Sequence, residues 1–467
     1  MANPQHDLII IGGGPGGYVA AIRAGQLGKD VVVVEKDAAL GGTCLLRGCI
    51  PTKALLHTAD LLQQARDGAT FGVVADNVRL DLAAAHKHQQ KTVTKSSKGV
   101  EFLFRKNKVK WLHGAGRLLG GGQVEVTAPD GQKTTISGRT IVLATGSRCG
   151  DLPMVKADGD RIINSDHALE LAEVPGTLLV LGAGAVGMEF ASIYARFGSQ
   201  VTVVEMLDRV LPLEDPDVSK EVERAFRRQG IPCHTSTALA EVKVEDGKVV
   251  ARGKKASGEE VAFEADRLLL AVGRVAVTEG LGLENTQVKL ERGRIVVDAD
   301  LRTGEPNVYA IGDLINTPWL AHVASAEGIH AVEHAAGLNP PRIDYNQVPS
   351  CTYCWPEVGS IGLSEPKAKQ AGYDVRVGSF PFSAIAKATI LGESIGFVKI
   401  VADAKYDEVL GVHIVGPHAT ELIAEAEAAL RGELTSEELV HTIHAHPTLH
   451  EAIHEAAEAV TGAAIHI

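Results

Sequence analysis

Residues 7–35 read DLIIIGGGPGGYVAAIRAGQLGKDVVVVE, and this stretch decides the fold. Two apolar runs flank Gly12, Gly14 and Gly17, and the second run ends at Glu35. In a G-x-G-x-x-G turn, the glycines allow the tight turn, the approach of a pyrophosphate and close helix packing. The stretch therefore predicts a strand–helix–strand unit, with a dinucleotide phosphate at the helix N-terminus and a ribose on the acidic residue.

The same pattern recurs at residues 177–205, TLLVLGAGAVGMEFASIYARFGSQVTVVE, at an offset of 170 residues. Gly182, Gly184 and Gly187 repeat the glycines, and Glu205 repeats the acidic end. A pair of ordinary glycine-rich turns is the alternative, but both copies have strand–helix–strand context. Two such sites imply electron transfer between two cofactors, and we expect FAD at the first. We expect NAD at the second, because the carboxylate of Glu205 would repel a 2′-phosphate.

A cysteine pair follows the first unit, in GGTCLLRGCIPTKALL at residues 41–56. Cys44 and Cys49 are separated by four residues. Structural disulfides are rare in a reducing compartment, so a close pair beside a cofactor loop favours a redox pair that opens and closes in turnover. Buried, inert thiols are the alternative.

Composition excludes several classes of function. The formal net charge of −12 argues against a nucleic-acid partner, which needs a basic face. No apolar run reaches the length of a membrane span, about 18 residues, and the start of the chain lacks a secretory signal. We therefore expect a cytoplasmic protein. Cys351 and Cys354 form a C-x-x-C pair, but no second pair accompanies it, so no metal site is expected.

The remaining segments complete the predicted architecture. Helices are expected at about 51–68 and 80–106, and a β-rich segment then ends in ATGS. A strand ends at Gly273, another precedes Asp313, and a helix follows from Ala321. Beyond the proline-rich residues 339–349, alternating segments predict antiparallel strands and then helices. The fold class is α/β: two Rossmann-like dinucleotide-binding domains plus a C-terminal α+β dimerisation domain.

Together with HPTLHE at residues 446–451, these motifs resemble the FAD-dependent pyridine nucleotide–disulfide oxidoreductases, class I. Within that family the chain is most similar to the dihydrolipoamide dehydrogenase branch, from residue 7 to about 460. The resemblance implies FAD at 1–150, NAD at 151–275, a central domain at 276–345 and an interface domain at 346–467.

The resemblance also implies roles for individual residues. Cys44 would be the interchange thiol that meets dihydrolipoamide, and Cys49 would lie against the flavin. Lys53 would lie near the flavin N5 edge, with Glu189 beside it and the nicotinamide. Asp313 would bond the ribityl chain. The expected cofactor-binding residues are Gly12, Gly14, Gly17, Glu35, Gly42, Thr43, Lys53, Ala115, Thr145, Gly146, Ser147, Gly182, Gly184, Gly187, Glu205, Gly273, Asp313 and Ala321.

The C-terminal motif supplies a candidate base. Thiol–disulfide exchange needs an attacking thiolate, and Glu451 can orient His446 through its other ring nitrogen. In the family this pair comes from the partner subunit, which implies a homodimer. The lipoyl group would arrive on another protein, a 2-oxo acid dehydrogenase complex or a glycine cleavage carrier.

The chain departs from the family pattern at three places. Leu46–Arg47 replaces the usual Asn–Val, and we expect Arg47 to point to solvent rather than to act on the thiolate. His450 replaces serine, and the segment around Cys351 and Cys354 differs. The predicted reaction is NAD-linked oxidation of dihydrolipoamide. A reductase of quinones or other disulfides stays open, as does a non-catalytic flavoprotein subunit.

Overall fold

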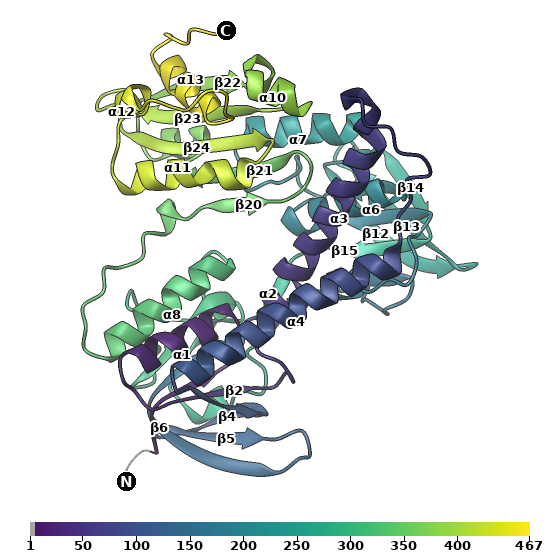
Figure 1. The fold of residues 1–467 in the computed structure, drawn as a ribbon. Helices are drawn as coiled ribbons and strands as arrows, with labels where there is room; N and C mark the ends of the chain where they lie inside the picture. Colours follow the sequence, from purple (N-terminus) through teal and green to yellow (C-terminus); the bar gives the residue numbers. More distant parts are fainter. Residues whose placement is uncertain (1–4) are drawn as a thin grey trace. The chain divides into compact units, whose positions relative to one another are not determined.

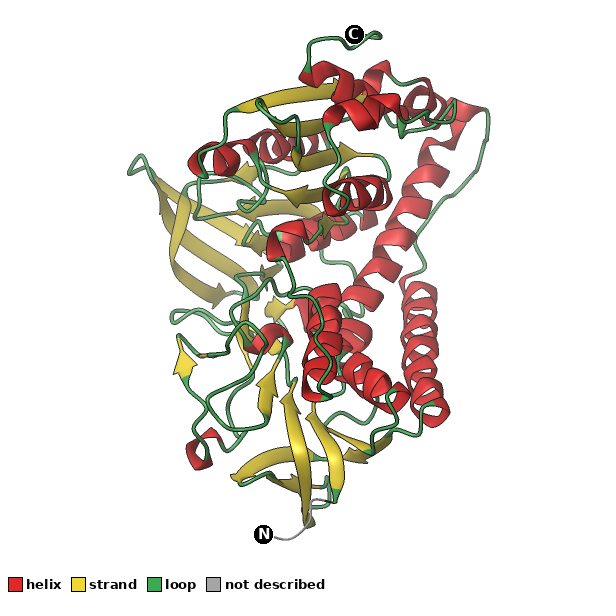
Figure 2. Cartoon of the chain, turned by 90° about the vertical axis from the view of Figure 1, so that its left-hand side faces the viewer, coloured by secondary structure: helices red, strands yellow, loops and turns green. Residues whose placement is uncertain are grey.

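The computed structural model describes residues 5–467, which separate into two compact units (Figure 1). The first contains the chain up to Ala54, Ala83–Gly150 and Arg274–Tyr345. The second contains Leu55–Leu82, Asp151–Gly273 and Asn346–Ile467. Figure 2, with helices in red and strands in yellow, shows the mixed α/β content that the sequence predicts.

The first unit is built on a parallel sheet. Its strands, in spatial order, are β3 (Lys110–His113), β2 (Val31–Glu35), β1 (His6–Ile11), β6 (Lys133–Leu143) and β19 (Val308–Ala310). The first part of β6 also pairs antiparallel with β5 (Gln123–Thr127), which pairs with β4 (Ala115–Gly120). All five residues of β2 are buried, as expected for a strand covered on both faces.

Helices α1 (Pro15–Gln26) and α8 (Ala321–Ala335) lie side by side on this sheet (Figure 1). A Cβ atom on Gly328 would lie 2.5 Å from the carbonyl oxygen of Gly16, so the two backbones approach closely only because residue 328 is glycine. Helix α4 (Leu82–Lys106) adds Val100 and Phe104 to the same core. Two short antiparallel pairs complete the unit: β7 (Ser147–Cys149) with β16 (Arg274–Ala276), and β17 (Leu290–Glu291) with β18 (Arg294–Ile295).

The second unit repeats the motif. Its parallel sheet has the order β11 (Cys233–His234), β10 (Gln200–Val204), β9 (Thr177–Leu181), β15 (Arg267–Leu270) and β8 (Ile162–Asn164). The accompanying helices are α5 (Ser165–Ala168), α6 (Ala185–Phe197) and α7 (Pro216–Arg228). An antiparallel meander follows, formed by β12 (Thr237–Glu245), β13 (Lys248–Lys255) and β14 (Glu260–Ala265). The predicted strand–glycine loop–helix–strand repeat is confirmed.

The C-terminal part of this unit is an antiparallel sheet, also as predicted. The strand order is β20 (Ser350–Thr352), β21 (Glu357–Gly362), β24 (Val409–Gly416), β23 (Phe397–Asp403) and β22 (Val375–Pro381). Its helices are α9 (Glu365–Gln370), α10 (Ala386–Leu391), α11 (Ala419–Arg431), α12 (Ser436–His441) and α13 (Glu451–Val460).

Two faces of this sheet differ in chemistry. Strands alternate the direction of their side chains, so Val398 and Ile400 face one side and Lys399 faces the other. The face with Val398 and Ile400 belongs to a core that α11 and α13 complete. The opposite face carries the buried side chains of Lys399 and His413.

The helix α3 (Cys49–Asp67) contributes its first turns to the first unit and the rest to the second. Within residues 5–467, no helix combines the length and apolar character needed to cross a bilayer.

Candidate active site

In the first glycine loop, side chains at Gly12 and Gly17 would clash with neighbouring backbone atoms. Gly12 has φ +113°, and a Cβ atom there would lie 2.2 Å from the carbonyl oxygen of Ala144. A Cβ atom on Gly17 would lie 1.9 Å from the oxygen of Gly12, so the helix and the turn touch directly. Gly14 caps α1 without a side-chain hydrogen bond, which leaves helix N–H groups available to an anion.

Glu35 closes the loop from the end of β2. Its carboxylate accepts hydrogen bonds from Gly13 N at 2.5 Å and Asp37 N at 2.8 Å. Burial raises the pKa of Glu35, although both N–H donors oppose that rise. Ala115 begins β4 next to Gly114, whose N–H donates to the carbonyl of Glu35 at 2.8 Å. Ala115 therefore lies by the expected ribose end of the loop.

The cysteine segment is attached to this glycine loop. Gly41 N donates to Gly13 O at 2.9 Å, and a Cβ atom on Gly42 would lie 2.6 Å from the Cα atom of Gly14. Gly42 starts the short helix α2 (Gly42–Arg47), which carries Cys44. Thr43, the next residue, directs its hydroxyl to Ser147 O at 3.4 Å. The position of α2, the helix that carries Cys44, thus follows from the contact between two glycine turns.

Cys44 and Cys49 are joined by a side-chain hydrogen bond, and this bond is the main reason why the pKa of Cys44 is raised. Burial raises that pKa further, while the charge of Lys53 opposes the rise. Tyr18 of α1 also faces the pair: burial and then the two thiols raise its pKa. This environment therefore favours the protonated form of Cys44.

A second polar group lies within the same unit. Ser147 hydrogen-bonds the carboxylate of Asp313, and Arg274 donates to Ser147 Oγ at 2.6 Å and to Ser147 O at 2.8 Å. Burial raises the pKa of Asp313, opposed by Ser147 and Arg274. Thr145 Oγ1 donates to Val277 O at 2.7 Å.

The turn that carries Asp313 is held from α8. Gly312 N donates to Glu327 Oε2 at 2.6 Å, and Tyr345 donates to Glu327 Oε1 at 2.9 Å. Ala321 is the first residue of that helix. The sequence patterns that contain Glu327 and Arg274 indicated no role for either residue. A buried acidic residue at an apolar helix face is the signal that could have indicated Glu327.

The second glycine loop repeats the geometry of the first. Gly182 has φ +105° and would place a Cβ atom 2.4 Å from Ala271 O, and Gly187 would place one 1.9 Å from Gly182 O. Around Gly184 nothing lies within 4 Å of such an atom. Glu205 accepts from Ala183 N at 2.7 Å and Leu207 N at 2.8 Å, which holds its carboxylate at the loop.

Two further expected residues belong to the second unit. Gly273, at φ +105°, follows β15 on the chain. Glu189 is 5% exposed on α6 and accepts a hydrogen bond from Tyr353 N at 3.0 Å. Its expected pairing with Lys53, a residue of the first unit, stays a prediction.

The C-terminal motif forms the predicted histidine–carboxylate contact. His446 Nδ1 lies 2.8 Å from Glu451 Oε1, and the N–H of Thr448 donates to Glu451 Oε2 at 2.9 Å. Partial burial raises the pKa of Glu451, but the hydrogen bonds from His446 and Thr448 outweigh it, so that pKa is low. The His446 side chain is 71% exposed, which leaves Nε2 accessible for proton transfer.

Known protein families match most of the chain. Residues 6–328 match the family described as pyridine nucleotide-disulphide oxidoreductase, and residues 348–457 match its dimerisation domain. The chain belongs to the pyridine nucleotide-disulphide oxidoreductase family. Accordingly, it is an FAD-dependent, NAD-linked oxidoreductase.

Relatives in this family match nearly full length. A dihydrolipoyl dehydrogenase of Bacillus subtilis is 45% identical over 99% of both chains. A mitochondrial dihydrolipoyl dehydrogenase of Pisum sativum is 42% identical over 99% of this chain and 93% of its own. The crystal structure of LpdA from Mycobacterium tuberculosis superposes with a TM-score of 0.89 at 30% identity, covering 97% and 99% of the two chains.

The first unit fits the FAD of this oxidoreductase family. Gly14 has only the Cα atom of Gly42 near its missing Cβ, at 3.8 Å, so a backbone cradle opens at the helix start. Glu35 and Asp313 lie at the ends of β2 and just beyond β19, both at the carboxyl ends of parallel strands. A dinucleotide binds at that edge of an open α/β sheet.

The structure also shows the surroundings of Arg47 and Cys354, which lie where the sequence departs from the family pattern. The Arg47 side chain is 37% exposed, and its guanidinium pairs with Asp37 at 2.5 Å, a contact that the sequence did not predict. The cause is the turn after β2, which places Asp37 beside α2. Cys354 is buried, and its thiol donates to Pro356 O at 3.2 Å. Across residues 5–467, no group of three or more candidate side chains is arranged to hold a metal ion.

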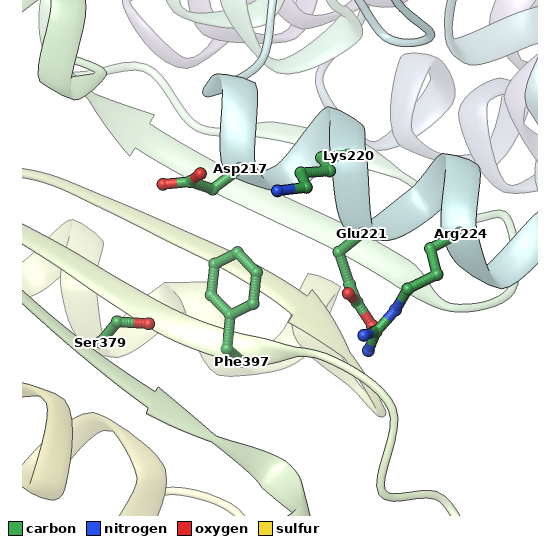
Figure 3. A pocket seen from close by; sticks show the side chains of 6 residues that line it. All are labelled: Asp217, Lys220, Glu221, Arg224, Ser379 and Phe397. Atoms are coloured by element: carbon green, nitrogen blue, oxygen red, sulfur yellow. The ribbon is translucent and has the colours of Figure 1, made fainter.

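A cavity of about 270 Å³ lies between α7 and the C-terminal sheet of the second unit (Figure 3). Figure 3 shows Glu221 and Arg224 lying together, and their charged groups are 2.8 Å apart. Asp217 is 2.6 Å from Lys399. Ser379 and Phe397 form the opposite wall. Three of the four charged residues that line this cavity are thus in ion pairs, and its volume is below that of typical ligand pockets, about 300–1,000 Å³.

Proposed function

We propose that this chain is a dihydrolipoyl dehydrogenase in which Cys44 receives electrons from the substrate and Cys49 lies on the cofactor side. The observation that supports it is the contact of Gly42 with Gly14, which attaches the cysteine segment to the first dinucleotide loop. The names of the full-length relatives supply the substrate class.

The thiol chemistry begins with the oxidised Cys44–Cys49 disulfide. His446 takes the proton of one dihydrolipoyl thiol, and the resulting thiolate attacks the Cys44 sulfur. This forms a mixed disulfide and releases Cys49 as a thiolate. His446 releases the first proton to solvent and then takes the proton of the second dihydrolipoyl thiol, whose sulfur attacks its partner sulfur in the mixed disulfide and closes the lipoyl ring.

That second attack expels the sulfur of Cys44. Because burial and the bond to Cys49 raise the pKa of Cys44, the leaving sulfur takes up a proton, and protonated His446 supplies it. Glu451 holds Nδ1 of the imidazole and thereby keeps Nε2 as the atom that exchanges protons.

Bound FAD would supply the two-electron relay between the dithiol and NAD+. Glu35 and Asp313 would hold its ribose and ribityl hydroxyls, and Lys53 would provide a positive charge at its reactive edge. Thr43, Thr145, Gly146, Ser147 and Ala321 would line the remaining contacts. On the second loop, Glu205 would accept the NAD ribose hydroxyls and Glu189 would lie towards the nicotinamide.

The chain is expected to act as a homodimer, with His446 and Glu451 serving the Cys44 of the partner subunit. A dimerisation domain at residues 348–457 supports this assembly. We assign residues 1–150 to FAD, 151–275 to NAD, 276–345 to the central domain and 346–467 to the interface. The lipoyl group would be presented by a separate carrier protein.

The test is Cys44→Ser in the FAD-loaded protein, assayed with free dihydrolipoamide and NAD+. We expect turnover to be abolished while the flavin absorbance and its reduction by a chemical reductant persist. Cys233→Ser is the matched control, since burial raises the pKa of that thiol to about 12 and makes it inert. Full dihydrolipoamide turnover by Cys44→Ser would refute the scheme. Absence of flavin reduction by NADH in the unmodified protein would instead favour a non-catalytic flavoprotein.

A further inference from the structure

Glu425 on α11 contacts two histidines that flank His446 on the chain. Its Oε1 atom lies 2.7 Å from His444 Nε2, and its Oε2 atom lies 2.7 Å from His450 Nδ1. Each ring nitrogen acts as a donor because a carboxylate only accepts. One carboxylate therefore joins the residue two before His446 and the residue four after it.

The segment between these histidines carries the base. His446 and its loop begin after α12 and end at His450, the residue that precedes α13. Glu451, the orienting carboxylate, is the next residue. His444 is only 9% exposed, whereas His446 is 71% exposed. The loop is thus fixed at its ends. The imidazole of His446, which the loop presents, hydrogen-bonds Glu451.

We propose that Glu425 and His450 are positioning residues that hold the His446–Glu451 pair in its reactive geometry. This inference rests on the proposed function, in which His446 exchanges protons with the substrate thiols. A misplacement of a catalytic group by about 1 Å can reduce a rate about 100-fold. The two contacts of Glu425, with His444 and His450, are called the clamp, and they should therefore affect turnover directly.

Both oxygens of Glu425 accept a hydrogen bond, one from each end of the loop. Removal of the His450 imidazole would leave Glu425 with its contact to His444 at the other end of the loop.

The experiment compares variants of the holoenzyme by kcat/KM for free dihydrolipoamide with saturating NAD+. Glu425→Gln offers one acceptor oxygen and can serve only one histidine, so we expect a drop of about tenfold. His450→Ala should lose about threefold, and His450→Gln, which keeps an N–H donor, should recover most of that loss. Glu427→Gln on the same helix is the matched control and should match the unmodified enzyme.

Two measurements distinguish a positioning role of Glu425 and His450 from a merely structural one. Reduction of ferricyanide by NADH needs no thiol step, so every variant should keep that rate. In His446→Gln, where the drop should be about 10²- to 10⁴-fold, adding Glu425→Gln should cause no further loss. A further tenfold loss in that double variant, or equal rates for Glu425→Gln and Glu427→Gln, would overturn the clamp. If His446→Gln alone turns over dihydrolipoamide normally, the proposed base fails and the clamp with it.

Discussion

Lys399 should be the most sensitive charged residue for stability. It lies on β23, its side chain is 3% exposed, and its Nζ atom contacts Asp215 at 3.0 Å, Asp217 at 2.6 Å and Glu365 at 2.9 Å. Asp215 is fully buried and also accepts from the N–H groups of Asp217 and Glu365, at the starts of α7 and α9. We consider Lys399→Met, which keeps the unbranched apolar part of the side chain and removes its charge.

The size of the stability loss in Lys399→Met depends on which carboxylate loses its positively charged partner. Asp217 is 58% exposed and Glu365 is 28% exposed, so water can replace much of what Lys399 provides to them. Asp215 has no exposed surface, and removal of one partner of a buried pair costs about 3–5 kcal/mol. An unfolding entropy of about 2.1 cal/mol/K per residue gives about 1 °C per kcal/mol for 467 residues, so the melting temperature of the variant should fall by about 3–5 °C.

The pH dependence has a defined sign. Burial raises the pKa of Asp215, but the hydrogen bond from Lys399 and its neighbours lower it more, so the folded pKa is below the usual value. Such a group stabilises the fold above its unfolded pKa, about 3.9, and loses that contribution as the pH falls through the folded pKa. In Lys399→Met the penalty comes from an ionised Asp215, so the difference in melting temperature should shrink from pH 7 towards pH 4.

Calorimetry of the FAD-loaded protein, at equal protein concentration and flavin content, measures this difference. Lys369→Met is the matched control, because Lys369 is 58% exposed and pairs with the same Glu365 at 2.6 Å. Its loss should cost about 0.2–1 kcal/mol. Equal shifts for the two variants, or a difference that grows on acidification, would refute the reasoning.

Two further predictions concern the second dinucleotide loop. Gly187→Ala places a methyl group 1.9 Å from Gly182 O, so calorimetry should show a loss of stability of about 1–3 kcal/mol or more. Gly184→Ala has no atom within 4 Å of the added methyl group, so it should melt at the normal temperature but raise the KM for NAD+ about tenfold. Normal NAD+ kinetics in Gly184→Ala would argue against a pyrophosphate at this helix start. Glu205→Ala should reduce the preference for NAD+ over NADP+, measured as the ratio of kcat/KM values, by about tenfold or more, because it removes both a ribose acceptor and a charge that repels a 2′-phosphate. An unchanged ratio would exclude Glu205 as the selecting residue.

Local patterns made much of the fold predictable from sequence. Both glycine loops, their apolar strands and the antiparallel C-terminal strands follow from short-range spacing, which records how a segment packs on a sheet. The contact of His446 with Glu451 was also predictable, because only four residues separate the two and a family motif supports the pair. These elements depend on neighbours in the chain.

Contacts between distant segments were not predictable in the same way. Ser147 meets Arg274 and Asp313, which are 127 and 166 residues away. Lys399 meets Asp215 across 184 residues. A single charged residue in an apolar strand carries no information about which carboxylate it will reach. For Arg47 the preference of arginines for solvent gave no indication of the pair with Asp37, which the turn after β2 brings close.

The two glycine loops show where functional difference arises in this chain. Their backbones are nearly equivalent: in both, the third glycine would place a Cβ atom 1.9 Å from the oxygen of the first. What packs against the middle glycine differs. Gly14 has the cysteine-bearing segment beside it through Gly42, whereas no atom lies within 4 Å of the missing Cβ of Gly184. On the proposed function, a shared loop would bind a cofactor twice, and thiol chemistry would accompany only the copy against which a second glycine turn packs.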